Sequence, residues 1–208
     1  MKLALILLCS LSLFAKQPHP VAKVDTWFKE EKERTEGRFF KLASLATVAS
    51  DGRPHARMIE ITNFNQAKGA LFFTHEKTEK VSQLSYNPHA SLNVYLPRTH
   101  RQLCIDGIVN QIPREEAEKA WNKMPRFMKF TFMASNTGEL LESQTTLENR
   151  RKELEKEYPK AVPCPPEFRG YRLAPDRIIF FEVHHRSFPT KEIATLEQNE
   201  WICTAVEP

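Results

Sequence analysis

The spacing of apolar residues changes along the chain, and each change marks a different kind of element. Within residues 21–35, Val21, Val24, Trp27 and Phe28 follow one another at helical spacing, with charged residues between them. This pattern predicts an amphipathic helix that buries one face. Further helices are predicted over residues 79–86 after Thr78, residues 114–124 after Pro113, and residues 145–158.

Between these helices the apolar residues form short runs or alternate with polar ones, which is typical of β-strands. Asp51-Gly52 separates the first two strands, and this dipeptide is favoured in tight hairpin turns. Four prolines within residues 159–166 indicate an extended surface link. The predicted strands are residues 42–50, 53–64, 70–74, 89–96, 101–112, 168–173, 177–185, 192–198 and 200–206.

Together these elements predict one α+β domain, built on an antiparallel β-barrel of six to eight strands with flanking helices. Strands and helices do not alternate as they do in a doubly wound parallel sheet. The sequence contains no Gly-x-Gly-x-x-Gly motif and no phosphate-loop motif, so dinucleotide binding of the usual kind is disfavoured. A length of 208 residues fits a single domain.

Residues 1–15 differ in kind from the rest of the chain. Met1-Lys2 precedes an apolar run that ends at Phe14, and Ala15 follows, which is the pattern of a secretory signal peptide. This pattern predicts an exported, periplasmic protein with a mature domain of residues 16–208. The alternative is a packed N-terminal arm on a cytoplasmic protein. The run is too short to cross a bilayer, so no stable membrane insertion of the mature chain is expected.

Composition excludes some classes of function. The 30 basic and 26 acidic residues give a net charge of +4 but are interspersed, so no nucleic-acid-binding stripe is expected. Cys104, Cys164 and Cys203 are too scattered for a disulfide framework or a zinc site. His184 and His185 are neighbours on a strand and would point to opposite faces, so no metal site is expected there. The 14 Phe fit either an aromatic core or a flat aromatic ligand.

One stretch of the chain combines groups that bind phosphate. Arg57 lies on a predicted strand, Phe73-Thr74 on the next, and Thr78 and Lys80 at the start of the helix that follows. Helix N-termini carry partial positive charge and free amides, so a lysine in the first turn is poorly placed unless an anion compensates it. The sequence therefore predicts an anion site here, while the alternative is that Lys80 points to solvent.

Several segments, taken in order, closely resemble the pyridoxamine 5'-phosphate oxidase family. They are SLATVASDGRPHARMIEI, LFFTHEKTEKVSQLSYNPHASLNVYLP, RQLCIDGIVNQI and the late PPEFRGYRLAPDRIIFFE. The resemblance runs from about residue 27 to residue 208. It implies an antiparallel split β-barrel that binds flavin mononucleotide (FMN), and a homodimer in which both subunits build each flavin site.

The resemblance also implies which residues contact FMN. Arg57 and Lys80 match the cations that meet the flavin phosphate, Gln102 matches a glutamine that reaches the flavin, and Phe181 stands where the family has a tryptophan. Glu79 departs from a family arginine, which removes one phosphate contact. The implied cofactor-binding residues are Arg57, Met58, Ile59, Thr62, Phe73, Thr74, Thr78, Lys80, Gln102, Thr137 and Phe181.

The positions that hold the substrate phosphate in the family have changed. Thr62 replaces a lysine, and Ala120, Met124 and Met128 replace a Tyr-x-x-x-Arg-x-x-x-Ser set. A phosphate buried without counter-charges is costly, so pyridoxamine 5'-phosphate should not bind tightly in the usual pose. Arg126, Arg186 and Lys191 lie near enough in sequence to substitute for one of these ligands. The candidate substrate-binding residues are Thr62 and Arg126.

Two functions remain open. The resemblance implies an FMN-dependent oxidase that converts an amine or alcohol to an aldehyde and oxygen to hydrogen peroxide; the alternative is a non-catalytic flavin- or haem-binding protein. Met124, Met128 and Met133 lie among phenylalanines in residues 127–132, and this cluster indicates a packed core, a subunit interface or an apolar substrate pocket. No catalytic residue is assigned.

Overall fold

The computed structural model describes residues 19–65 and 67–208, so the signal peptide predicted over residues 1–15 lies outside the described residues. The described chain forms five helices and nine strands. The helices are α1 (Pro20–Arg34), α2 (Glu79–Tyr86), α3 (Arg114–Lys123), α4 (Arg126–Ala134) and α5 (Gln144–Glu157). The strands are β1 (Leu42–Val48), β2 (Pro54–Glu60), β3 (Asn63–Asn65), β4 (Gly69–His75), β5 (His89–Leu96), β6 (Arg101–Gln111), β7 (Phe168–Glu182), β8 (Thr190–Glu197) and β9 (Glu200–Val206).

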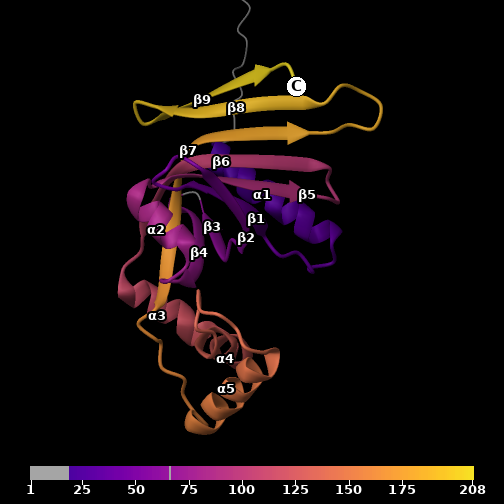
Figure 1. The fold of residues 1–208 in the computed structure, drawn as a ribbon. Coiled ribbons are helices and arrows are strands. Elements are labelled where there is room, and N and C mark those ends of the chain that lie inside the picture. The colour runs from indigo at the N-terminus through magenta and orange to yellow at the C-terminus, as the bar shows by residue number, and fades with distance from the viewer. Residues whose placement is uncertain (1–18, 66) are drawn as a thin grey trace, which may run out of the picture.

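All strand pairs are antiparallel and belong to one curled sheet of order β2-β1-β5-β6-β7-β4-β3. The long strand β7 joins the two parts of this sheet. Its first half pairs with β4, and its second half pairs with β8, which in turn pairs with β9. Figure 1 shows β7 running from the end of the molecule that holds α3, α4 and α5 to the opposite end, where the β8–β9 hairpin lies. This is the split barrel that the sequence predicts, with nine strands instead of six to eight.

A bulge bends β7 where the sequence predicts a break between two strands. The β6–β7 register shifts between Asp106 and Gly107, so Gly107 pairs with Pro175 while Asp106 pairs with Arg177. A Cβ on Gly107 would lie 2.0 Å from the carbonyl oxygen of Ala174, so only glycine allows the two backbones to approach this closely. The predicted strands 168–173 and 177–185 are therefore one continuous strand.

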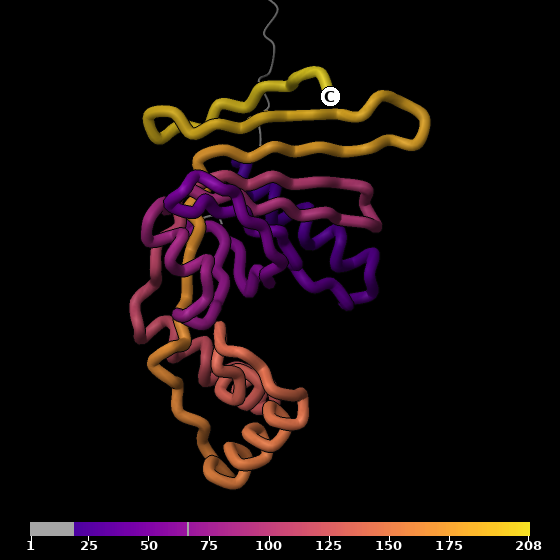
Figure 2. Tube along the Cα trace, in the orientation of Figure 1, coloured from indigo at the N-terminus to yellow at the C-terminus, as the bar shows by residue number. Residues whose placement is uncertain are grey.

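The main core lies between α1 and the sheet. Trp27 and Phe28 on α1 are buried, as their helical spacing predicts. The Trp27 ring meets the Phe180 ring edge-on at 5.2 Å, and the Phe28 ring meets the Phe64 ring in the same way at 5.7 Å. In Figure 2 the indigo tube of α1 lies beside strands that come much later in the chain.

A buried carboxylate fixes the same helix to the turn between β5 and β6. Glu31 is fully buried, and its two carboxylate oxygens accept hydrogen bonds from the backbone N–H groups of Arg98 and Thr99, each at 2.9 Å. The Thr99 hydroxyl donates a third bond at 2.9 Å. Three donors compensate the loss of water around this charge, so Glu31 can be buried without a cation.

A second core lies under the helical end of the molecule. Trp121 on α3 is fully buried, its indole N–H donates to the carbonyl of Val162 at 2.9 Å, and Phe130 and Phe168 pack in the same cluster. The sequence does not predict helix α4, because the apolar residues of RFMKFTFMA do not follow one helical face. The Met and Phe residues within 124–133 therefore lie partly in this core and partly along a cavity beside α4.

Two smaller features differ from the sequence prediction. The β1–β2 connection takes residues 49–53, with Gly52 at φ +83°, so Asp51-Gly52 lies in a five-residue loop and not in a two-residue turn. His184 and His185 lie beyond the end of β7, not on a strand.

In the part of the chain that the structure describes, no helix is long and apolar enough to cross a membrane. The same residues contain no group of three or more His, Cys, Asp or Glu side chains placed to hold a metal ion.

Candidate functional site

A cavity of about 470 Å³ lies between strands β2 and β4 and the helix α4. Its volume is in the range of small-molecule sites. The lining residues are Met58, Ile59, Glu60, Thr62, Phe73, Thr74, His75, Lys80, Met124, Phe127, Met128, Thr131, Phe132, Ser135, Thr137 and Phe168. Seven of the residues that the resemblance implies are therefore brought together: Met58, Ile59, Thr62, Phe73, Thr74, Lys80 and Thr137.

Lys80 is held at one end of this cavity by a chain of hydroxyl groups. It lies in the first turn of α2, half-buried, and its Nζ donates to Thr74 Oγ1 at 3.0 Å. Thr74 Oγ1 lies 3.2 Å from Thr78 Oγ1, which donates to the carbonyl of His75 at 2.8 Å. Thr78 is the N-cap residue, but its side chain makes no capping hydrogen bond to α2; its hydroxyl donates to the carbonyl of His75 instead. The first backbone N–H groups of α2 are left for another acceptor.

Arg57 is fixed nearby by neutral partners. Its Nη1 donates to Thr47 Oγ1 at 2.5 Å and to the carbonyls of Leu45 and His55 at 3.2 Å. Its Nη2 donates to Gln83 Oε1 at 2.8 Å, and Thr47 Oγ1 donates to the same oxygen at 2.6 Å. Within the described residues Arg57 Nε makes no hydrogen bond, so the guanidinium is oriented while part of its donor set stays free.

The two cations are not neutralised by nearby acids. In the described chain neither Arg57 nor Lys80 forms an ion pair with a carboxylate; their partners are the hydroxyl, amide and carbonyl groups above. Burial lowers the pKa of Lys80, the positive charge of Arg57 lowers it further, and Glu79 opposes the effect. Burial also lowers the pKa of Arg57. Two half-buried cations beside a helix N-terminus favour an anion at this point.

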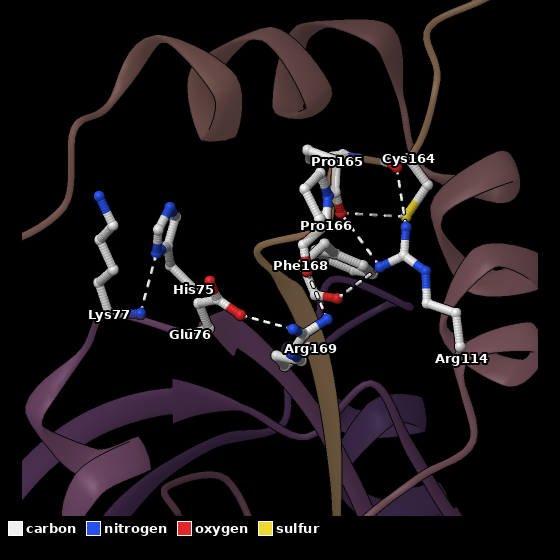
Figure 3. A network of polar contacts seen from close by, with 9 residues as sticks. All are labelled: His75, Glu76, Lys77, Arg114, Cys164, Pro165, Pro166, Phe168 and Arg169. Atoms are coloured by element: carbon white, nitrogen blue, oxygen red, sulfur yellow. Dashed lines mark hydrogen bonds and ion pairs between the residues drawn. The ribbon is translucent and has the colours of Figure 1, made fainter.

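Aromatic rings form another side of the cavity, and a polar network holds them. Phe73 on β4 stacks on Phe168 on β7, with ring centroids 5.0 Å apart and planes 9° from parallel. Figure 3 shows the guanidinium of Arg114 aimed at the backbone of residues 164–168; it donates to the carbonyls of Cys164 at 2.8 Å and of Pro165 and Phe168 at 3.1 Å. In the same network Arg169 pairs with Glu76 at 2.5 Å. Arg114 therefore holds the backbone of Phe168 on one side, and the Arg169–Glu76 pair holds the next residue on the other.

Five of the predicted residues do not line this cavity. Arg57 and Thr78 lie beside residues that do, since Arg57 precedes Met58 on β2 and Thr78 contacts Thr74. Gln102 on β6 and Phe181 on β7 are paired neighbours on the far part of the sheet. Arg126 donates to the carbonyls of Tyr158 and Lys160, and its guanidinium lies 5.0 Å from the centre of the Phe130 ring. The structure therefore does not bring Arg126 to the cavity. Within the described residues, its two terminal nitrogens bond only to these two carbonyls.

Sequence reasoning missed the residues that support the site. Thr47 and Gln83 are buried polar residues that orient Arg57. The sequence holds one sign of such a role. Thr47 is a polar residue at a position of β1 where the alternating pattern places a buried side chain. Glu60 and His75 also line the cavity. Burial lowers the pKa of His75, against the opposing charges of Glu167 and Glu76, and this shift favours the neutral imidazole.

Comparison with known proteins shows the family to which the chain belongs. The family model described as pyridoxamine 5'-phosphate oxidase matches residues 30–155. A pyridoxine/pyridoxamine 5'-phosphate oxidase of Paraburkholderia phytofirmans is 31% identical over 195 residues, covering 91% of this chain and 89% of the relative. Another of the same name, from Paraburkholderia phymatum, is 34% identical over 175 residues, covering 83% and 81%.

Solved structures show the same fold. PhzG from Burkholderia lata, in complex with tetrahydrophenazine-1-carboxylic acid, superposes with a TM-score of 0.85 and 27% identity, over 93% of this chain and 95% of that one. A pyridoxamine 5'-phosphate oxidase-related, FMN-binding protein from Nostoc punctiforme superposes with a TM-score of 0.75 and 18% identity, over 92% and 99%. The chain therefore belongs to the pyridoxamine 5'-phosphate oxidase family, and its fold is that family's split barrel.

Proposed function

We propose that the protein is an FMN-dependent oxidoreductase whose flavin phosphate binds between Arg57 and Lys80. The observation that carries this proposal is a pair of half-buried cations without carboxylate partners in the described chain: Lys80, which lines the cavity, and Arg57, which lies beside it. A phosphate dianion would remove the repulsion between them and accept from Lys80, Arg57 and the first amides of α2. Because Thr47, Gln83 and Thr74 already orient both side chains, little order has to be gained on binding.

The rest of the cavity suits the flavin ring. Ile59 and Phe73 offer apolar surface, and Thr62 and Thr137 add hydroxyl groups. Relatives that carry the name pyridoxine/pyridoxamine 5'-phosphate oxidase, and a structural neighbour described as FMN-binding, support FMN as the cofactor. The residues that would hold it fit its chemistry: cations for the phosphate, and apolar and hydroxyl side chains for the ring.

A second copy of the chain would complete the site. Gln102 and Phe181 lie on the outer face of the sheet, away from the cavity of their own chain. The same face exposes Leu42, Met58 and Tyr95 on neighbouring strands, and Met58 also lines the cavity. Exposed apolar residues gathered on one face are typical of an interface. We infer a homodimer in which Gln102 and Phe181 of each subunit approach the flavin of the other.

The reaction follows from the cofactor. A flavin held by Arg57 and Lys80 would supply two-electron redox chemistry, with an amine or alcohol carbon as the hydride donor and oxygen as the final acceptor of both electrons. For a primary amine the balanced change is amine, water and oxygen to aldehyde, ammonia and hydrogen peroxide. The protein's part is to orient the ring, keep the phosphate in place and hold neutral His75 beside the cavity. The alternative, a non-catalytic flavin- or haem-binding protein, is favoured by the altered positions Thr62, Met124 and Met128, which all line the cavity.

The experiment compares FMN affinity in two charge-reversal variants. Lys80→Glu turns a charge-assisted contact into a repulsion, so the Kd for FMN should rise by more than about tenfold. Lys68→Glu makes the same change on an exposed turn outside the cavity and should leave the Kd within about twofold of the wild type. Quenching of flavin fluorescence gives both values. Equal affinities in the two variants would overturn the proposed phosphate site.

A further inference from the structure

One wall of the cavity comes from α4 and the residue that ends α3, and it is almost free of charge. Met124, Phe127, Met128 and Phe132 are apolar, and Thr131 adds a hydroxyl group. Phe127 and Met128 are well exposed at this wall, with 62% and 45% of their surface accessible. Methionine and phenylalanine side chains favour flat, polarizable rings, and methionine adapts to their outline.

The titratable groups at the cavity are few. Among its lining residues only Glu60, His75 and Lys80 carry ionisable side chains. If Lys80 holds the flavin phosphate, Glu60 and neutral His75 remain for a second ligand. A second phosphate group would then lie near a carboxylate, and the lining residues of the same chain would offer it no further cation, which is an unfavourable arrangement in a half-buried site.

Cations elsewhere in this part of the molecule are already engaged. Arg126 donates to two backbone carbonyls on the α5 side, and Lys129 is buried with its Nζ donating to the carbonyl of Asn122 at 3.3 Å. Figure 3 shows the same for Arg114 and Arg169, which bond to backbone carbonyls and to Glu76. If any of them moved to a ligand, its present acceptors would lose their donors, and this loss would offset the new hydrogen bond.

We propose that the second ligand of this site is a flat aromatic amine without a phosphate group, held against the Met124–Phe132 wall. The proposal rests on the proposed function, since it assigns Lys80 to the flavin. Apolar rings gain from burial against Phe127, Met128 and Phe132, and Glu60 favours a positively charged amino group over an anion. PhzG, a structural relative, is seen with tetrahydrophenazine-1-carboxylic acid, a ring compound that carries a carboxyl group and no phosphate, so it supports the ring and not the amino group.

The test measures ligand binding to the FMN-loaded full chain by the change in flavin absorbance. Three probes are compared: pyridoxamine 5'-phosphate, pyridoxamine, which lacks only the phosphate, and 2-naphthylmethylamine, an apolar two-ring amine. The expected order of affinity is naphthylmethylamine first and pyridoxamine 5'-phosphate last, with at least about a tenfold gap between pyridoxamine and its phosphate ester. Pyridoxamine 5'-phosphate binding as tightly as pyridoxamine, or more tightly, would overturn the inference.

A substitution tests whether the lack of a cation at this wall causes the weaker binding of pyridoxamine 5'-phosphate. Met124→Arg places a cation at the half-buried end of the wall and should reduce the preference against the phosphate ester by at least about tenfold. Met124→Leu changes the side chain without adding charge and should keep the wild-type order of ligands. A Met124→Arg protein that still binds FMN and keeps the wild-type preference would overturn the inference; if that variant does not fold, the wild-type comparison decides.

The two proposals fail in different ways. A wild-type protein that does not bind FMN would overturn the proposed function and this inference together. A protein that binds FMN and prefers the phosphorylated probe would overturn this inference alone.

Discussion

At the scale of single residues, the site depends on how Lys80 and Arg57 are held. Both are partly desolvated, and each is bonded to neutral groups, so their charge is available to an anion and raises the free energy of the empty site. The sequence leaves two alternatives for Lys80, an anion site or a side chain that points to solvent. The structure places its Nζ 3.0 Å from Thr74 Oγ1 instead.

The lowered pKa of Lys80 predicts how FMN affinity depends on pH. The phosphate binds the charged form of Lys80, and burial and Arg57 shift the loss of that charge to a pH below the ordinary lysine pKa of about 10.4. FMN affinity should therefore fall as the pH rises from 7 through this lowered pKa. Lys80→Arg keeps its charge over the whole range and should hold its affinity nearly constant. Parallel pH profiles for the two proteins, measured by flavin fluorescence, would contradict the assignment of Lys80.

The residues that the sequence could predict are those whose type and position carry the chemistry. Arg57, Lys80 and Thr74 follow from charge, the helix start and the family resemblance, and the structure brings them to one place. Gln83 could not be predicted, because its role depends on a contact across 26 residues with Arg57. Arg126 looked suitable from its position alone, but its guanidinium is bonded to the backbone of the segment after α5.

At the scale of elements, periodicity predicted α1, α2, α3 and α5 closely and failed at α4. The Met and Phe residues of α4 lie partly against the second core and partly against the cavity, so its apolar residues do not follow one helical face. The continuity of β7 was also hidden, because Pro175 and the bulge beside Gly107 look like a break in sequence. Both are tertiary effects that local patterns do not contain.

Glu31 offers a test of how α1 is fixed to the sheet. Replacing it by glutamine sets an NH₂ group against the N–H donors of Arg98 and Thr99, so Glu31→Gln should lower the free energy of unfolding by about 1–3 kcal/mol. Glu33→Gln makes the same change on the exposed face of the same helix and should lower it by less than about 0.5 kcal/mol. Urea unfolding measures both; equal midpoints would show that the buried carboxylate contributes little.

At the scale of the whole molecule, the outer face of the sheet predicts self-association. Sedimentation at micromolar concentration should give twice the 24.2 kDa mass of one chain. Tyr95→Glu places a charge in the proposed interface and should shift the protein to monomers with weaker FMN binding. Tyr86 is as exposed as Tyr95, 63% against 61%, but lies at the end of α2, and Tyr86→Glu should stay dimeric. A wild-type monomer would contradict the shared site.

The signal peptide stays a prediction, since residues 1–15 lie outside the described structure. Mass spectrometry of protein from its native cell would check it: a mature N-terminus at Lys16 supports export, and an intact leader on soluble protein contradicts it. Neither result bears on the cavity, whose lining begins at Met58.

The central claim is that the cavity beside Arg57 and Lys80 is a flavin site. The most direct test is a titration of the purified, flavin-free wild-type protein with FMN, followed by fluorescence and by thermal unfolding. The proposed site predicts saturation at one FMN per chain and an unfolding temperature that rises with FMN concentration, because the ligand binds the folded state. A protein that shows no saturable quenching and no change in unfolding temperature at millimolar FMN would contradict the claim.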